Sequence, residues 1–215
     1  LGEKVRYDGQ HRLDHFLRDS LGQFVCWHPV CPEVGCGLPV PRESMHLEGS
    51  AAEPRLITTR TRRDLTAQMS RWLDQILPEL AAADLRGFVF KSKSPSSGMR
   101  DVKIYSAAGM PVARGAGLFA RAFMARFPLL PVEDDGRLHD PHLRENFLER
   151  VFTYDRWRRY ETDDASRRGL VAFHTRHKLL LMCHRPAAVA ELGRLVARSG
   201  PKSLATLRAE YLSGL

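Results

Sequence analysis

Long apolar runs are absent from this 215-residue chain, and cysteine is scarce, with only four residues. A membrane-spanning helix needs about 18 or more consecutive apolar residues, and no stretch approaches that length. The first residues also lack the charged and then apolar order of a secretory leader. These absences predict a cytoplasmic globular protein with no membrane partner, in which four cysteines do not form a disulfide framework.

The spacing of the cysteines narrows their possible roles. No Cys-x-x-Cys pair occurs, which argues against a zinc site. Cys26 falls in a predicted strand and Cys183 in an apolar helical run, so both are interpreted as small core residues. Cys31 and Cys36 lie in Pro- and Gly-rich loops, where Cys31 could serve either structure or function.

Acidic residues are outnumbered by basic ones, with 25 Asp and Glu against 33 Lys and Arg, giving a formal net charge of +8. Arginine supplies most of the excess, and its planar fork binds phosphate through two hydrogen bonds at once. The charge is compatible with an RNA or nucleotide partner, although charge alone is weak evidence for one.

The N-terminal half alternates strand and helix signals. Alternating apolar residues predict strands near 24–30, 87–90 and 102–105, and helical spacing predicts helices near 11–20, 61–83 and 115–127. Pro78 is expected to kink or split the second helix. This alternation predicts an α/β domain with a largely parallel sheet.

The pattern changes between residues 128 and 141. A last short strand precedes an acidic linker, and helical periodicity then covers residues 141–159, 168–184 and 187–197. We therefore expect an α/β domain over residues 1–137 and a partial all-α domain over residues 138–215. The chain opens on Leu1 without an initiator methionine and stops after a helical segment, so we expect a fragment that is incomplete at both ends.

Two loops carry the candidate chemistry. Cys31 and Glu33 follow a predicted strand in one loop, and Ser94, Ser96 and Ser97 precede Gly98 in the other. Loops at the carboxyl ends of strands in α/β sheets carry binding and catalytic groups, so a site would form if the two loops meet. Taken singly, Glu33 could instead be solvated or cap a helix, and the serine loop lacks the spacing of a P-loop.

A basic cluster lies on the predicted helix 168–184. His174, Arg176, His177 and Lys178 share part of this helix. Two histidines three residues apart can bind a metal, but no carboxylate accompanies them there. A basic surface that contacts RNA is the preferred interpretation for His174, Arg176 and Lys178.

Several ordered motifs together resemble the desulfidases of the thiouracil desulfurase family. The motifs are Arg6-Tyr7-Asp8-Gly9, Val30-Cys31-Pro32-Glu33, Pro39-Val40-Pro41-Arg42, Lys93-Ser94-Pro95-Ser96-Ser97-Gly98 and Gly115-Ala116-Gly117-Leu118-Phe119. Residues 170–182 and 191–195 resemble the start of a helical domain of unknown function that is fused to such desulfidases. The resemblance covers nearly the whole chain and implies removal of sulfur from 4-thiouridine in transfer RNA.

The resemblance also implies a cofactor and roles for residues. In the family, three cysteines hold a [4Fe-4S] cluster, whose open iron would bind a thiocarbonyl sulfur and act as a Lewis acid while water attacks the carbon. Here Cys31 would be a ligand, Glu33 the proton shuttle, and Ser94 the group that orients substrate or water. The implied substrate contacts are Arg6, Tyr7, Asp8, Ser96 and Gly98.

The sequence departs from the family pattern at the cluster ligands. The first family cysteine would precede Leu1, and the third position is Ser97, a hard ligand that should weaken assembly of the cluster. Cys36 would have to reach across the site to substitute. Two hypotheses follow: an iron-sulfur desulfidase that is altered or incomplete, or an RNA-binding protein without a cluster. A third, a nucleotide-binding α/β domain, requires that the two loops lie far apart.

Overall fold

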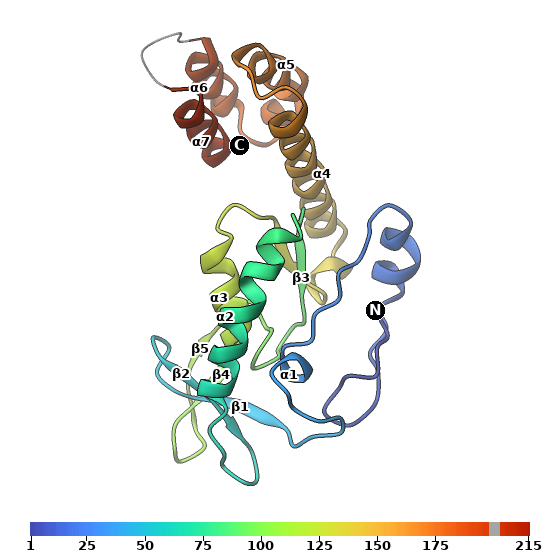
Figure 1. Ribbon diagram of the computed structural model, residues 1–215, viewed down its shortest axis with the longest axis vertical. Helices are drawn as coiled ribbons and strands as arrows, with labels where there is room; N and C mark the ends of the chain where they lie inside the picture. The colour runs from blue at the N-terminus through green and yellow to red at the C-terminus, as the bar shows by residue number, and fades with distance from the viewer. Residues whose placement is uncertain (198–202) are drawn as a thin grey trace. The chain divides into compact units, whose positions relative to one another are not determined.

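A computed structural model describes residues 1–197 and 203–215 (Figure 1). The chain divides into two compact units, Leu1–Phe147 and Leu148–Leu215. The first unit contains strands and helices and the second is helical, which confirms the expected α/β fold followed by helices. No helix among the described residues is long and apolar enough to cross a membrane.

The sheets of the first unit combine parallel and antiparallel pairs. The larger sheet has the order β2-β1-β4-β5, and its strands are β1 Met45–Gly49, β2 Pro54–Thr58, β4 Val102–Tyr105 and β5 Pro111–Gly115. Only β1 and β4 are parallel in it, because β1–β2 and β4–β5 are joined by short connections. A second sheet pairs β3 Phe88–Phe90 with β6 Val132–Asp134 in parallel. The pairing is thus mixed rather than largely parallel.

Two helices bury the apolar side chains of the first unit. Helix α2, Thr66–Ala82, buries Met69, Leu73 and Leu80, and it continues through Pro78 without being split. Helix α3, Leu118–Arg126, buries Phe119 and Phe123. These phenylalanines lie against the aromatic rings of strand β3: the Phe88 and Phe123 ring centroids are 4.4 Å apart. The spacing of apolar residues therefore located both helices correctly.

The first 35 residues differ from the sequence-based prediction. In place of a helix over 11–20, a short π-helical turn covers Phe16–Ser20 and a 3₁₀ turn covers Leu21–Gln23. Residues 24–30 form no strand, and Phe24 is 74% exposed. Cys26 is exposed as well, and so is Cys183 on the second unit, so the interpretation of both as core residues is wrong. The apolar pattern was present, but no strand pairs with this segment.

Four helices make up the rest of the chain in so far as the structure describes it. They are α4 Pro141–Asp163, α5 Arg167–His184, α6 Pro186–Ala197 and α7 Leu204–Gly214. Trp157, Phe173 and Tyr211 centre the core of the second unit, with the Trp157 and Tyr211 rings stacked 5.5 Å apart. Each of the three helices expected beyond residue 140 is present, because their apolar residues recur at helical spacing.

Candidate functional site

A short helix positions Cys31 and Glu33. Helix α1, Pro32–Gly35, begins after Cys31, with Pro32 at its first position, where the missing N–H costs nothing. The Gly35 backbone nitrogen donates to the Cys31 carbonyl at 2.8 Å. A side chain at Gly35 would come within 2.6 Å of the Trp72 ring on α2. The glycine therefore allows α1 to pack closely on α2.

The serine loop is attached to the start of helix α3. The Ser96 carbonyl accepts a hydrogen bond from the Ala120 nitrogen at 3.2 Å, and the Gly98 carbonyl accepts one from the Gly117 nitrogen at 2.8 Å. A side chain at Gly117 would meet the Ser96 carbonyl oxygen at 2.4 Å. The glycines that begin the helix thus let the serine backbone approach it closely.

The two loops meet at the carboxylate of Glu33. The Ser96 hydroxyl donates to Glu33 Oε1, and the Ser94 hydroxyl lies 3.5 Å from the same oxygen and 3.0 Å from the Ser96 hydroxyl. The Ser97 backbone nitrogen donates to Ser94 Oγ at 3.1 Å. On the other side, the Cys31 thiol donates to Glu33 Oε2 at 3.4 Å. The nucleotide-binding hypothesis required the two loops to lie far apart, so their proximity argues against it.

Arg42 is a further member of the site that the sequence did not single out. Its Nη2 lies 3.5 Å from Glu33 Oε2, and the two side chains are only 7% and 14% exposed. The same nitrogen donates to the Val5 carbonyl at 2.9 Å, and the Arg42 backbone nitrogen donates to the Tyr7 carbonyl at 2.7 Å. The signal that could have revealed it was the Pro-Val-Pro-Arg motif that ends at this residue.

Arg6 and Asp8 form a tight turn with each other. Two guanidinium nitrogens of Arg6 donate to the Asp8 carboxylate at 3.1 and 2.8 Å, and the Gly9 nitrogen donates to the Arg6 carbonyl. The hydrogen bonds from Arg6 hold the pKa of Asp8 below its usual value. The turn is tied to the site through Arg42 and the Tyr7 carbonyl, and no described contact brings the Arg6, Tyr7 or Asp8 side chain to Glu33.

The thiols beside Glu33 are kept in their protonated form. Burial, reinforced by the negative charge of Glu33, raises the pKa of Cys31. Burial and the same carboxylate raise the pKa of Cys36, whose thiol donates to the Glu33 carbonyl at 3.3 Å. Neither thiol is therefore prepared as a free nucleophile.

The residues present do not supply the ligands of a four-iron cluster. Such clusters are held mainly by thiolates. At the expected positions the site offers one thiol, Cys31, and the buried Ser97. Over residues 1–197 and 203–215, no group of three or more His, Cys, Asp or Glu side chains could hold a metal ion. The chemistry that can be assigned to this site is therefore proton transfer by the side chains that line it.

The predicted RNA-contact residues of the helical unit separate into two groups. Arg176 and Lys178 are exposed on helix α5. His174 is only 5% exposed, and its Nδ1 lies 3.1 Å from the Tyr211 hydroxyl in the helical core. Its ring therefore contributes to packing, and the expectation that it contacts RNA is not compatible with this position.

Comparison with known proteins identifies the family. No curated protein sequence matches the chain. A solved structure described as a [4Fe-4S]-dependent thiouracil desulfidase, TudS, is similar, with a TM-score of 0.52 and 30% sequence identity over 68% of this chain and 91% of that one. The sequence profile of 2-thiouracil desulfurase matches residues 1–135. The chain therefore belongs to the 2-thiouracil desulfurase family.

Proposed function

We propose that this protein removes sulfur, as sulfide, from a thiolated uracil base, and that its substrate is 4-thiouridine in transfer RNA. The observation that carries the proposal is that hydroxyls of the serine loop meet the Glu33 carboxylate, which lies more than 60 residues earlier in the chain. Family membership supports a thiolated uracil as the substrate class.

Glu33 is proposed to carry the proton. In the net hydrolysis, a water oxygen bonds to the carbon that bears sulfur, the carbon–sulfur bond breaks, and sulfur leaves with the protons of the water. An ionised carboxylate can accept a proton from the attacking water and return it to the departing sulfur. Ser96 donates to one oxygen of Glu33, and the Ser94 hydroxyl lies beside both groups, so the two serines fix the direction of the free lone pairs of the carboxylate.

Substrate contacts are proposed for the remaining polar groups around the serines. Ser94 would orient the base or the water. Gly98 is proposed to contact the base through its backbone, since it packs so closely on Val102 that an added side chain would lie 2.5 Å from it. Arg6, Tyr7 and Asp8 are proposed to border the base, with Tyr7 47% exposed.

A second candidate function is favoured by one observation. By the family resemblance, Ser97 would stand at the position of a cluster ligand, and the described site contains a single cysteine at an expected ligand position. A protein that binds RNA through surfaces such as Arg176 and Lys178, without a cluster, would fit these residues. In this alternative the Glu33 site would be a binding site only.

Release of sulfide tests the proposal directly. The full chain, after anaerobic reconstitution with iron and sulfide and removal of the excess, is incubated with 2-thiouracil, 4-thiouracil and transfer RNA that contains 4-thiouridine. Released sulfide and the loss of thiocarbonyl absorbance are measured, with Glu33→Gln as the matched variant. Release that depends on Glu33 supports the enzyme. RNA binding without release from any of the three substrates supports the second candidate.

A further inference from the structure

The loop between strand β2 and helix α2 is strongly basic. Residues 59–63 read Thr-Arg-Thr-Arg-Arg, and all five are exposed. No acidic residue interrupts them. An exposed run of arginines at this density attracts polyanions, and the question is which of these positive charges are free to bind one.

The backbone of this loop is fixed from within the protein. The Glu43 carboxylate accepts hydrogen bonds from the Thr61 nitrogen and the Thr61 hydroxyl, both at 2.7 Å, and also from the Arg60 nitrogen. At the base of the loop, Thr58 Oγ1 accepts from the Arg63 nitrogen at 2.8 Å. The shape of the loop therefore does not depend on the arginine side chains.

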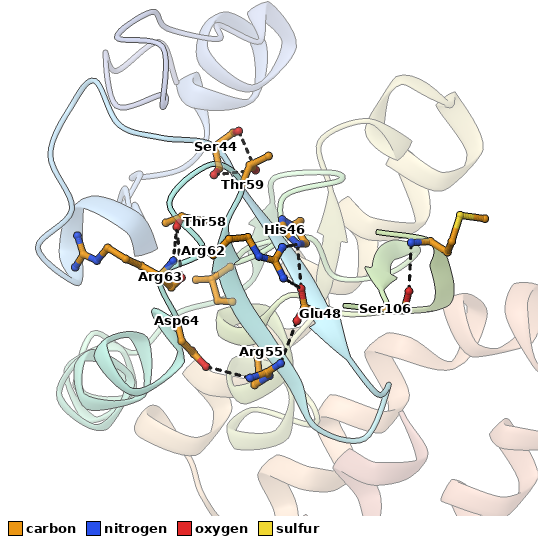
Figure 2. A network of polar contacts seen from close by, with 12 residues as sticks. Ser44, His46, Glu48, Arg55, Thr58, Thr59, Arg62, Arg63, Asp64 and Ser106 are labelled. Carbon is orange, nitrogen blue, oxygen red and sulfur yellow. Dashed lines mark hydrogen bonds and ion pairs between the residues drawn. The ribbon is translucent and has the colours of Figure 1, made fainter. Parts of the chain in front are cut away.

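Two arginines near the loop are already neutralised. Arg55 and Arg62 both pair with Glu48, which lies on β1 and is 3% exposed, and the contact from Arg55 is 3.0 Å long (Figure 2). Arg62 adopts a φ of 57°, in the left-handed region, which reverses the chain at this point. These two side chains compensate the charge of the buried Glu48 carboxylate, because an unpaired charge there would destabilise the fold.

The other two arginines of the loop remain available. Figure 2 shows the Arg63 side chain directed away from Glu48, on the opposite side from Arg62. Among the residues that the structure describes, neither the Arg60 nor the Arg63 guanidinium forms an ion pair or hydrogen bond, and both residues are exposed. Hydrogen bonds from Thr61 are the main cause of the lowered pKa of Glu43, to which the Arg60 charge makes only a minor contribution. Each can therefore bind an external anion without breaking an internal contact.

The loop adjoins the Glu33 site through Arg42. A surface depression is lined by Pro41, Arg42, Glu43, Ser44, Thr59 and Arg60. Arg42 contributes to this depression and also contacts the Glu33 carboxylate. A ligand that occupies the depression thus lies beside Arg60, and only Arg42 separates it from Glu33, the proposed proton carrier.

We propose that Arg60 and Arg63 bind phosphodiester groups of an RNA strand whose thiolated base enters the Glu33 site. The part of this inference that concerns the base rests on the proposed function. A guanidinium fork matches two phosphate oxygens, and successive phosphates along an RNA strand can occupy two neighbouring arginines. A free thiolated base carries no phosphate and gains nothing from this loop.

The test is the affinity of the full chain for a fluorescein-labelled RNA hairpin, prepared with and without one 4-thiouridine, over a series of salt concentrations. The variant Arg60→Ala/Arg63→Ala is compared with Lys103→Ala/Arg114→Ala. The control pair removes the same charge from exposed register partners on β4 and β5. For two lost phosphate contacts, Kd should rise at least about tenfold near 0.1 M salt. The plot of the logarithm of the binding constant against the logarithm of the salt concentration should become less steep by about 1.4. The control should change Kd less than about twofold.

The outcomes separate this inference from the proposed function. Equal weakening by both pairs, or no weakening by Arg60→Ala/Arg63→Ala, would overturn the inference. So would equally tight binding of polyglutamate of matched charge that depends on the same two arginines, because the loop would then bind any polyanion. Sulfide release from free 2-thiouracil should be unchanged in Arg60→Ala/Arg63→Ala. If the unmodified protein releases no sulfide from any substrate, the proposed function fails, while the RNA affinities still decide the role of the loop.

Discussion

The hydroxyl of Ser96 donates to the carboxylate of Glu33 across 63 residues of sequence, and Ser96 is completely buried. The backbone carbonyl of the same serine accepts from Ala120 on helix α3. Ser96 therefore ties the carboxylate to the serine loop and the loop to the helix. Since water cannot reach its hydroxyl, Glu33 and Ser94 are its hydrogen-bonding partners.

Replacing Ser96 by alanine should destabilise the protein. The variant loses a buried hydrogen bond to a charged group, which contributes about 2 kcal/mol. We expect the free energy of unfolding, measured by urea denaturation, to fall by about that amount, together with a loss of sulfide release. The exposed Ser70 on α2 is a suitable control, and Ser70→Ala should change the stability by less than about 0.5 kcal/mol. Equal stability of the two variants would contradict the role given to Ser96.

Arg42 should be required for stability and for the orientation of Glu33. Arg42→Ala leaves a nearly buried carboxylate without its cation and the Val5 carbonyl without its donor, a loss of about 3 kcal/mol. Arg42→Lys keeps the charge, but one ammonium cannot replace the two terminal nitrogens that donate to the Val5 and Pro39 carbonyls, so it should recover only part of the stability. Urea denaturation measures the loss. If Arg42→Lys were as stable as the unmodified protein, charge alone would account for the effect.

Removing the charge of Glu33 should make Cys31 more reactive. Burial is the main cause of the raised pKa of this thiol, and the Glu33 charge adds to it, so Glu33→Gln should lower that pKa. More thiolate would then be present between about pH 7 and 9, and alkylation should be faster. Iodoacetamide labelling followed by peptide mass spectrometry measures each cysteine separately. The exposed Cys26 is an internal reference, and an unchanged ratio of Cys31 to Cys26 labelling would argue against the influence of Glu33.

The helical unit should lose stability in mild acid because of His177. Burial, together with the charges of Arg156 and Arg176 and the neighbouring His174, lowers the pKa of this ring, although its contact with the Phe173 carbonyl opposes the shift. In the unfolded chain the ring has an ordinary pKa of about 6.5 and binds a proton first as the pH falls. The stability that the neutral ring contributes is therefore complete above about pH 6.5 and is lost below it.

Thermal unfolding followed by circular dichroism at about pH 7.5 and about pH 5.5, on either side of the ordinary histidine pKa, measures this dependence. His177→Gln should show a smaller drop in Tm between the two pH values than the unmodified chain. The exposed His142 provides the control, and His142→Gln should keep the full drop. An identical pH response in all three proteins would exclude His177 as the source.

Restoring a thiol at position 97 should improve cluster loading. Ser97 is buried within the serine loop, and a thiolate there is a far better ligand for iron than a hydroxyl. We expect Ser97→Cys to retain several-fold more iron and acid-labile sulfide per chain after anaerobic reconstitution than the unmodified protein, with Ser70→Cys as a control for an added thiol. Equal loading of the unmodified protein and the Ser97→Cys variant would show that serine, or Cys36, is an adequate ligand. No loading of either would favour the RNA-binding alternative.

Local pattern was sufficient for most helices and for the position of the candidate loops. Helix α2 was expected over 61–83 and covers Thr66–Ala82, and the strand expected over 102–105 is β4. The burial of His174 could also have been predicted, because Leu170, His174, His177 and Leu181 recur at helical spacing along one face of α5. In each case neighbouring residues on one element carry the information.

Pairing between distant segments could not be predicted in this way. The apolar segment 24–30 finds no partner strand, whereas β1 was missed although Met45 and Leu47 alternate with His46 and Glu48, because this alternation extends over only five residues. Glu48 is tolerated inside the fold only because Arg55 and Arg62 arrive from β2 and the loop that follows it. A strand exists only when another segment supplies its hydrogen bonds, and that depends on the whole fold.

The sequence by itself determined which residues could perform chemistry: Cys31 and Glu33 in one turn, and the serines 94, 96 and 97 in another. Only the tertiary structure decided that Ser96 and Arg42 converge on Glu33, and that Arg62 pairs with Glu48 while Arg60 and Arg63 have no ion-pair partner among the described residues. The physical reason is that side-chain identity and helical periodicity are local properties. Hydrogen bonding, burial and ion pairing across dozens of residues are fixed by how α1, α2 and α3 pack, and no short stretch of sequence encodes that packing.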